Sequence, residues 1–198
     1  TVVLNTAPTA PVTLGLASSN VAEGTVSPAS LTFTPTNWNA PQAVTVTGVN
    51  DAIQDGNQPY TIVIAAPTST DARYQAINPP DVAVTNTDND SAGITVLPAT
   101  DLVTTEAGGT AVFTVALNSQ PVASVTIGLR SSNVAEGTVS PASVTFTTAN
   151  WNAPQPVTVT GVEDSIQDGN QPYIIVTAQG VSSDAAYAAI NPADVAVS

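Results

Sequence analysis

One stretch of sequence occurs twice in this chain. The segment SSNVAEGTVSPAS begins at Ser18 and again at Ser131, which sets an offset of 113 residues between the copies. That offset pairs residues 1–85 with residues 114–198 without a gap, and about 62 of the 85 pairs are identical. A fixed period indicates an array of similar modules, and a period this long leaves room for a separate core in each. We therefore predict two tandem domains of a modular protein.

The charge of the chain excludes several classes of partner. Fifteen acidic residues face only two basic ones, Arg73 and Arg130, and without histidine or lysine the net charge is −13. Nucleic-acid binding is excluded because no basic patch can displace counterions from phosphate. An anionic membrane surface would repel the chain, and no run of about 18 apolar residues predicts membrane insertion. The uncompensated carboxylates make cations the natural counter-charge.

The chain lacks the residue types that most enzymes use for catalysis. The chain has no cysteine and no histidine, so the usual nucleophile–base systems, disulfides and thiolate metal sites cannot form. Asp51 and Asp55 are formally a carboxylate pair of the kind that glycosidases use. Both aspartates recur in the second copy, however, and no candidate cleft residues accompany them. We predict that the protein is not an enzyme.

Short, β-branched, alternating segments dominate the chain and predict an all-β fold. In the first copy these predicted strands are residues 1–5, 12–16, 31–34, 43–49 and 60–65, each with an equivalent in the second copy. Residues 182–192 predict a short helical turn, capped by Ser183 or Asp184, in a long loop between the last two strands. The expected architecture is two tandem antiparallel Ig-like β-sandwiches of about seven strands each.

The repeat also sets the expected domain boundaries. We expect repeat 1 at residues 1–85, an acidic linker at residues 86–93 and repeat 2 at residues 94–198. Residues 94–113 have no counterpart in the first copy, so repeat 1 should lack its first strand and about half of its second. We interpret the chain as a window on a longer array in which upstream residues complete repeat 1. The alternative is a neighbouring chain that donates the missing strand.

The order of the motifs resembles the Calx-β domain, the calcium-binding sandwich of sodium–calcium exchangers that also recurs in bacterial surface proteins. The residues concerned are TTEAGGTAVFTVAL at 104–117, VTFT at 144–147, VTVTGVEDSIQDGNQPYIIVTA at 157–178 and TNTDND at 85–90. This resemblance implies calcium at one end of each sandwich. The implied ligands are Asp51, Asp55, Asp88 and Asp90 for repeat 1, and Glu106, Glu163, Asp164 and Asp168 for repeat 2.

Several positions depart from the family pattern. Asn50 stands where repeat 2 has Glu163, amides stand at Gln58 and Gln171 where the family often has an acid, and Asn89 interrupts the Asp run. Because calcium affinity depends on the number of charged ligands and on the rigidity of the site, we expect one or two Ca²⁺ ions at each junction between repeats.

The remaining acidic and aromatic residues are expected to be structural. Turn and cap positions account for the aspartates outside the predicted site. Glu23 and Glu136, in the repeated VAEGTV segment, could reach the ion site, but we predict that they lie in a solvated loop. Trp38 and Trp151 are expected to cover the end of a core rather than to stack on a sugar. The aspartates assigned to caps and turns are Asp71, Asp81, Asp184 and Asp194.

These features predict a structural repeat module of a long extracellular adhesin or fibre on a bacterial surface, with calcium at the inter-repeat junctions making the array rigid. The expected partners are neighbouring repeats of the same chain and other copies in a filament. A glycan or surface ligand is expected elsewhere in the full protein. Two alternatives stay open: a glycan- or protein-binding module, and a subunit of a self-assembling filament completed by a neighbour's strand.

Overall fold

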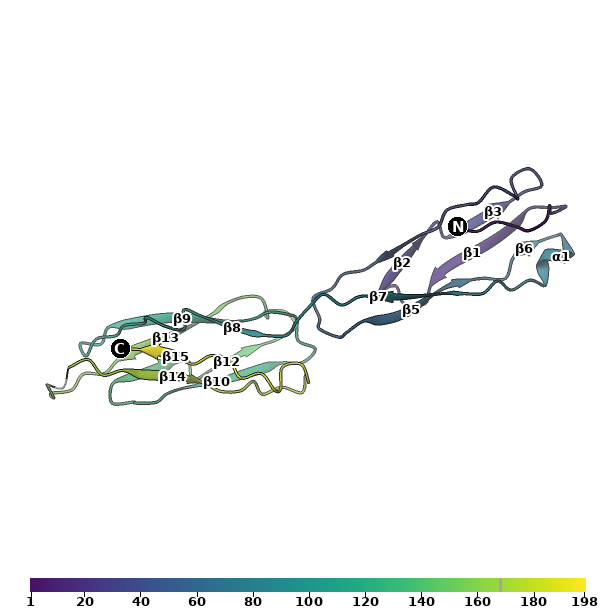
Figure 1. Cartoon of the computed structure of the whole chain (residues 1–198). Coiled ribbons are helices and arrows are strands. Elements are labelled where there is room, and N and C mark those ends of the chain that lie inside the picture. The colour runs from purple at the N-terminus through teal and green to yellow at the C-terminus, as the bar shows by residue number, and fades with distance from the viewer. Residues whose placement is uncertain (168) are drawn as a thin grey trace. The chain divides into compact units, whose positions relative to one another are not determined.

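The chain divides into two compact units (Figure 1). A computed structural model describes residues 1–167 and 169–198. Unit 1 comprises Thr1–Asp51 and Asp55–Asp88, and unit 2 comprises Ala52–Gln54 and Asn89–Ser198. Among the described residues, no helix is long and apolar enough to cross a membrane.

Unit 2 is a sandwich of two four-stranded antiparallel sheets. One sheet has the order β11-β13-β9-β8, with β8 (Ile94–Leu97), β9 (Thr110–Leu117), β11 (Gly137–Ser140) and β13 (Gln155–Gly161). The other has the order β12-β10-β14-β15, with β10 (Val125–Ser131), β12 (Ser143–Phe146), β14 (Tyr173–Thr177) and β15 (Val195–Val197). The sheets confirm the predicted all-β, antiparallel fold.

The core of unit 2 follows from the alternation along its strands. Alternate residues are buried along most of β13 and β10, as in Val157 and Val159 on one sheet and Val125 and Ile127 on the other. Successive side chains of a strand point to opposite faces, so this alternation turns one apolar row from each sheet toward the other. Phe113 and Phe146, from the two sheets, are fully buried in the same cluster.

Unit 1 repeats part of this arrangement. Its larger sheet has the order β3-β1-β5-β7, and β6 also pairs with β1. A second sheet contains only β2 and β4. The strands of unit 1 are β1 (Val12–Ser18), β2 (Gly24–Ser27), β3 (Ser30–Phe33), β4 (Thr45–Gly48), β5 (Gln58–Ile64), β6 (Thr68–Ser69) and β7 (Val82–Asn86).

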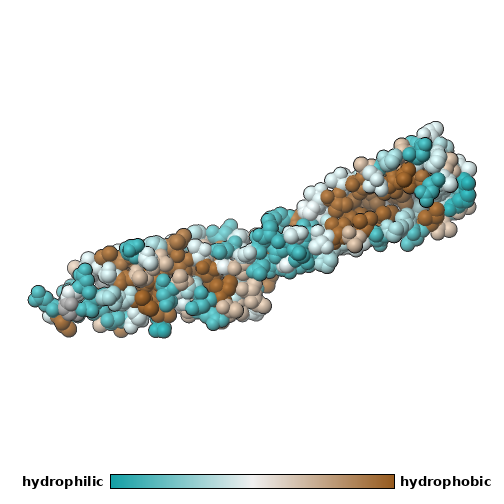
Figure 2. All heavy atoms as spheres, in the orientation of Figure 1, coloured by the Kyte–Doolittle hydropathy of each residue, from teal (hydrophilic) through white to brown (hydrophobic). Residues whose placement is uncertain are grey.

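The prediction of a strand at residues 1–5 is wrong for unit 1. There, Val2 makes only an isolated antiparallel bridge to Gln42, although the equivalent residues 114–117 belong to β9 in unit 2. The physical reason is the missing partner: in unit 2 these residues also pair with β8, and the described part of unit 1 has no such strand. Figure 2 shows hydrophobic side chains gathered on the visible face of unit 1.

The structure also has strands that the sequence did not predict, among them one that recurs in both units. The repeated GTVS segment forms β2 in unit 1 and β11 in unit 2, which pair with β4 and β13. Its Gly and Ser residues have low strand propensity, so pairing with a neighbour decides its conformation.

The predicted helical turn is present in both units, in two forms. In unit 1 it is helix α1 (Ala72–Gln75), which Asp71 caps by accepting from the Arg73 N–H. In unit 2 the equivalent residues form hydrogen-bonded turns, and Asp184 accepts from the Ala186 N–H at 2.9 Å. The expected roles of Asp71 and Asp184 as caps are confirmed.

Candidate metal centre

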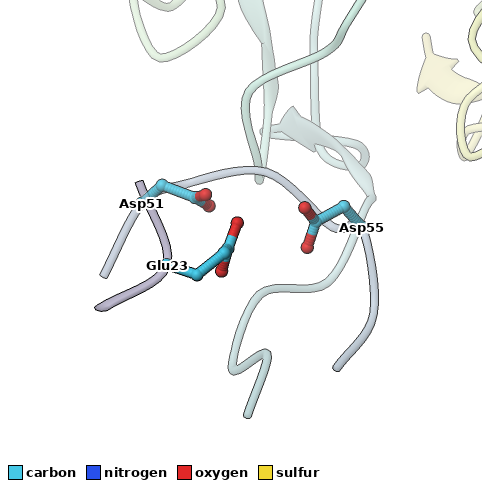
Figure 3. A group of neighbouring side chains, drawn as sticks. All are labelled: Glu23, Asp51 and Asp55. Atoms are coloured by element: carbon cyan, nitrogen blue, oxygen red, sulfur yellow. The ribbon is translucent and has the colours of Figure 1, made fainter. Parts of the chain in front are cut away.

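Three acidic side chains converge at one end of unit 1 (Figure 3). Glu23 precedes β2, and Asp51 and Asp55 lie in the loop between β4 and β5. One carboxylate oxygen from each residue lies within 4.8 Å of the others. Among the described residues, no other group of three acidic side chains has carboxylate oxygens close enough to bind one metal ion.

Backbone pairing fixes the position of Glu23. The Glu23 and Gly24 N–H groups both donate to the Asn20 carbonyl, at 3.2 and 3.1 Å, which closes a turn after β1. The Val49 N–H donates to the Glu23 carbonyl at 2.9 Å, next to the ladder that joins β2 to β4. These bonds place Glu23 beside the end of β4, where the loop that carries Asp51 begins.

A side-chain amide from the end of β7 holds the Glu23 carboxylate. Asn86 Nδ2 donates to Glu23 Oε2 at 3.1 Å and to the Val49 carbonyl at 2.7 Å. A Cβ atom on Gly48 would lie 2.6 Å from Asn86 Oδ1, so glycine is needed there for Asn86 to approach. Glu23 is therefore only 9% exposed, and the prediction that it lies in a solvated loop is wrong.

The spacing of the three carboxylates fits one calcium ion. Two oxygens that are each about 2.4 Å from one ion can lie at most about 4.8 Å apart, which is the limit that the oxygens of Glu23, Asp51 and Asp55 satisfy. Calcium takes six to eight oxygen ligands and accepts backbone carbonyls and water besides carboxylates. Asp51 and Asp55 are exposed, so water can complete the shell.

The other residues predicted for repeat 1 lie in different places. Asp88 belongs to unit 1 and is bound to the loop between β4 and β5: its Oδ2 accepts from the Gly56 N–H at 2.7 Å, and its own N–H donates to Asn57 Oδ1 at 3.0 Å. Asp90 belongs to unit 2. The structure thus brings together Asp51 and Asp55, adds Glu23, and fastens Asp88 to the same loop.

Of the residues predicted for repeat 2, those that the structure describes are not part of a comparable group of three acids. Glu106 and Glu136, the equivalent of Glu23, line a cavity of about 580 Å³ at one end of unit 2. Glu163 is exposed, and Asp164 closes a turn in which its Oδ1 accepts from the Ile166 N–H at 2.7 Å. Asp168 lies outside the described residues.

The aspartates assigned to structural roles hold loops in place. Asp81 Oδ1 accepts from the Ile64 N–H at 2.8 Å, and Asp194 Oδ1 accepts from the equivalent Thr177 N–H at 2.9 Å. Arg73 Nε donates to Asp71 Oδ1 at 3.1 Å, and Arg73 Nη2 donates to Asp71 Oδ2 at 2.8 Å. These bonds, together with one from the Thr9 N–H, hold the pKa of Asp71 well below its ordinary value. The same pairing raises the pKa of Arg73.

The tryptophans are half-buried. Trp151 packs against the core of unit 2, and its carbonyl accepts from the Leu117 N–H. Trp38 is half-buried in unit 1, where its carbonyl accepts from the equivalent Leu4 N–H. The packing of Trp151 agrees with the expected role of covering the end of a core.

Comparison with known proteins leaves the family open. No protein-family model and no curated protein sequence matches this chain. Among solved structures, the chain is similar to WR4, a Caenorhabditis elegans MSP family member, at 17% identity and a TM-score of 0.39, covering 52% of this chain and 94% of that one.

The solved structures of CBD12 from CALX1.2 and of a surface layer protein are also similar to this chain. The CBD12 domains of CALX1.2 match at 10% identity and a TM-score of 0.42, covering 88% of this chain and 70% of that one. Domains 1–6 of surface layer protein SbsC match at 15% identity and a TM-score of 0.36, covering 93% of this chain and 19% of that one. Because these TM-scores are below 0.5, they do not identify the function of this chain.

Proposed function

We propose that this chain is a non-enzymatic structural repeat module of a long extracellular fibre or adhesin on a bacterial surface, and that its repeats bind calcium. The observation that carries the proposal is the convergence of the Glu23, Asp51 and Asp55 carboxylates. Three negative charges this close repel one another, and a divalent cation between them removes that repulsion. The net charge of −13, with only two basic residues to offset the acids, agrees with cations as counter-charges.

Calcium at this position would stiffen the end of unit 1. The loop that carries Asp51 and Asp55 is already bonded to Asp88, where unit 1 ends, through Gly56 and Asn57. An ion that fixes the loop therefore also fixes the segment leaving the unit. In an array of such repeats, this would make each junction more rigid, and neighbouring repeats are the proposed partners.

Thermal unfolding with and without calcium tests the proposal. An affinity of about 10⁻⁴ M, typical of extracellular calcium modules, gives about 2.7 kcal/mol of stabilisation at 10 mM Ca²⁺. For a domain of this size that corresponds to a rise in Tm of roughly 10–20 °C. The rise should affect unit 1 and disappear in excess EGTA.

Matched variants separate a specific site from general charge screening. Asp51→Asn should abolish most of the rise in Tm, because it removes one ligand charge without changing the size of the side chain. Asp101→Asn is the control: Asp101 is exposed, lies outside the cluster and has a φ of 63°, which Asn tolerates. An equal calcium response in both variants, or the same response to Mg²⁺ as to Ca²⁺, would contradict the proposed site.

A further inference from the structure

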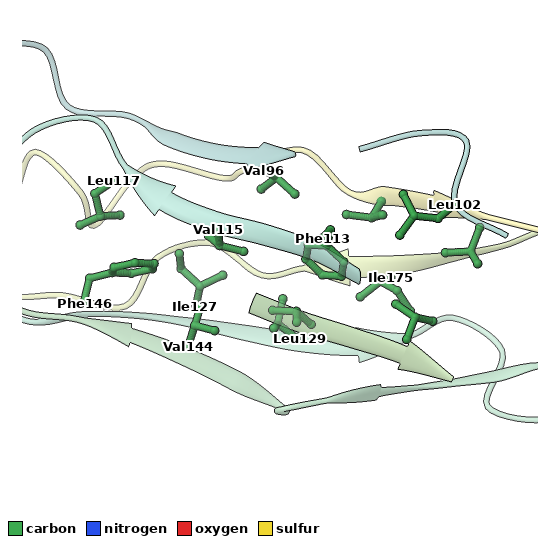
Figure 4. Close-up of a cluster of buried hydrophobic side chains, with 14 of the residues drawn as sticks. Val96, Leu102, Phe113, Val115, Leu117, Ile127, Leu129, Val144, Phe146 and Ile175 are labelled. Carbon is green, nitrogen blue, oxygen red and sulfur yellow. The ribbon is translucent and has the colours of Figure 1, made fainter. Parts of the chain in front are cut away.

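One sheet edge is the same in both units. Within the described residues, β3 ends the sheet β3-β1-β5-β7, and β12 ends the sheet β12-β10-β14-β15. Val144 and Phe146 of β12 point into the core (Figure 4), so the side chain of Thr145 faces outward between them. Thr32 is the equivalent residue of β3, and both threonines are exposed. Because this edge is present in both units, it is a property of the repeat itself.

The backbone of these strands turns polar groups toward the edge. Antiparallel strands alternate between hydrogen-bonded and non-hydrogen-bonded pairs of residues. The Leu16 N–H donates to the Ala29 carbonyl at 2.8 Å. In the same register Thr32 lies opposite Thr13, at a non-hydrogen-bonded position, so the Thr32 carbonyl points away from β1. The equivalent bond and register in unit 2 place the Thr145 carbonyl in the same way.

Side-chain amides cover these backbone groups in unit 1. Gln42 Nε2 donates to the Thr32 carbonyl at 2.8 Å. Just beyond the end of β3, the Thr34 N–H donates to Asn37 Oδ1 at 2.5 Å. A side-chain amide offers the same kinds of donor and acceptor as a peptide group. Gln42 and Asn37 therefore take hydrogen bonds that a neighbouring strand would otherwise make.

The same bonds recur in unit 2. Gln155 Nε2 donates to the Thr145 carbonyl at 2.7 Å, and the Thr147 N–H donates to Asn150 Oδ1 at 2.6 Å. Gln155 belongs to β13, in the opposite sheet, so its side chain reaches from one sheet to the edge of the other. All four amide side chains are half-buried. We call them the amide caps: Gln42, Asn37, Gln155 and Asn150.

Charged side chains do not protect this edge. Many natural edge strands carry charges that oppose pairing with another chain. Residues 24–50 and 137–162 contain no charged residue, in a chain with a net charge of −13. The edge strands lie within these ranges, and their sequences SLTF and SVTF differ at one position. Segments with high β-propensity and low charge pair readily with copies of themselves. Without its caps, each edge would therefore match the edge of another copy.

We propose that the edges at β3 and β12 are the places where copies of this repeat would pair strand to strand, and that the amide caps prevent this pairing. The partner that the caps exclude is the same edge of a second copy, because its strand is uncharged and nearly identical. Loss of a cap leaves a backbone carbonyl or N–H group free to bind that strand. The caps thus keep near-identical repeats separate, which also limits mispairing while the repeats fold.

Sedimentation velocity of a double variant, Gln42→Ala with Gln155→Ala, tests this proposal. The measurement is made over a range of protein concentrations in EGTA, so that the result does not depend on calcium. About 0.5 M NaCl is added, because it screens repulsion between copies beyond about 4 Å. We expect the variant to associate at a protein concentration at least ten-fold lower than the original chain. Hydrogen exchange should show new protection of residues 30–34 and 143–147 in the associated form.

Two matched variants separate loss of the caps from other effects. Gln179→Ala removes an amide that donates to the Ala188 carbonyl in a loop, at 2.6 Å, and should leave association unchanged. Gln42→Lys with Gln155→Lys keeps a donor at each position and adds a charge to each edge, so this variant should sediment like the original chain. Urea unfolding of every variant shows whether the associating chains are folded.

Four outcomes would overturn the proposal. The first two are sedimentation of the double variant like that of the original chain, and association of Gln179→Ala to the same extent as the double variant. The third is association that begins only under conditions in which the double variant unfolds. The fourth is new protection confined to residues outside the two edges, which would show that another surface joins the copies and that the caps only hold their own loops.

Discussion

Asn86 donates a hydrogen bond from its side-chain amide to the buried carboxylate of Glu23, at 3.1 Å, across 63 residues of sequence. The bond joins the last strand of unit 1 to the residue that precedes β2. It also aims the Glu23 carboxylate toward Asp51 and Asp55 (Figure 3). One ligand of the candidate calcium site is thus held before any ion binds, and this lowers the ordering cost of binding.

Glu23→Gln should weaken calcium binding to unit 1 at least ten-fold. The substitution keeps an oxygen that can accept from Asn86 but removes one of three ligand charges. Without calcium, the same variant should be at least as stable as the original chain, because the repulsion among the carboxylates falls. Calorimetric titration and thermal unfolding in EGTA measure the two effects. A variant that binds calcium normally would show that Glu23 is not a ligand.

The ion pair between Arg73 and Asp71 should affect unit 1 in acid. Because the pKa of Asp71 is lowered in the folded state, first by Arg73 and then by the Thr9 N–H, its ionised form stabilises the fold. That contribution is fully present above about pH 4, the ordinary pKa of Asp, and is lost as the pH falls through the lowered value.

Arg73→Ala should therefore make unit 1 unfold at a higher pH than the original chain. Unit 2 is the internal control, because Ala186 already stands at the position equivalent to Arg73. Acid titration followed by circular dichroism measures the midpoints. Identical midpoints for the variant and the original chain would show that the pair contributes nothing.

The two units should unfold independently when their cores are weakened one at a time. Phe33 and Phe146 occupy equivalent positions, and each is 0% exposed. Removal of a buried phenyl ring costs about 3–5 kcal/mol. Phe33→Ala should lower only the transition of unit 1, and Phe146→Ala only that of unit 2, as followed by calorimetry. A shift of both transitions by either variant would indicate that the units are coupled.

Equivalent tyrosines should differ in their contribution to stability. The Tyr187 hydroxyl donates to the Ser119 carbonyl at 2.6 Å and accepts from the Ser119 N–H at 3.0 Å, with both residues buried. Tyr187→Phe leaves both Ser119 groups without a partner, at a cost of about 1–3 kcal/mol.

Tyr74→Phe in unit 1 should cost less. Its hydroxyl bonds to Thr6, and Thr6 is exposed, so water can replace the lost bond. Urea unfolding of both variants gives the comparison. A larger loss for Tyr74→Phe would contradict this account of the two hydroxyl groups.

The sequence by itself determined the repeat, the all-β class and most of the strands. Alternation of apolar residues in segments such as 12–16 and 125–129 settles which face is buried, because the side-chain period of a strand is two. Local chemistry likewise identified Asp71 and Asp184 as caps. These features depend on neighbours in the chain, and a sequence displays such neighbours directly.

The tertiary structure alone decided the rest. Residues 1–4 and 114–117 are nearly identical in sequence, yet within the described residues the second set forms a strand, with β8 as its partner, and the first set makes a single bridge. The sequence around Glu23 predicts a solvated loop. In the structure Glu23 is buried, because Asn86 and Val49 contact it from other parts of unit 1. In both cases the deciding contact comes from a distant part of the chain, so the local sequence could not predict it.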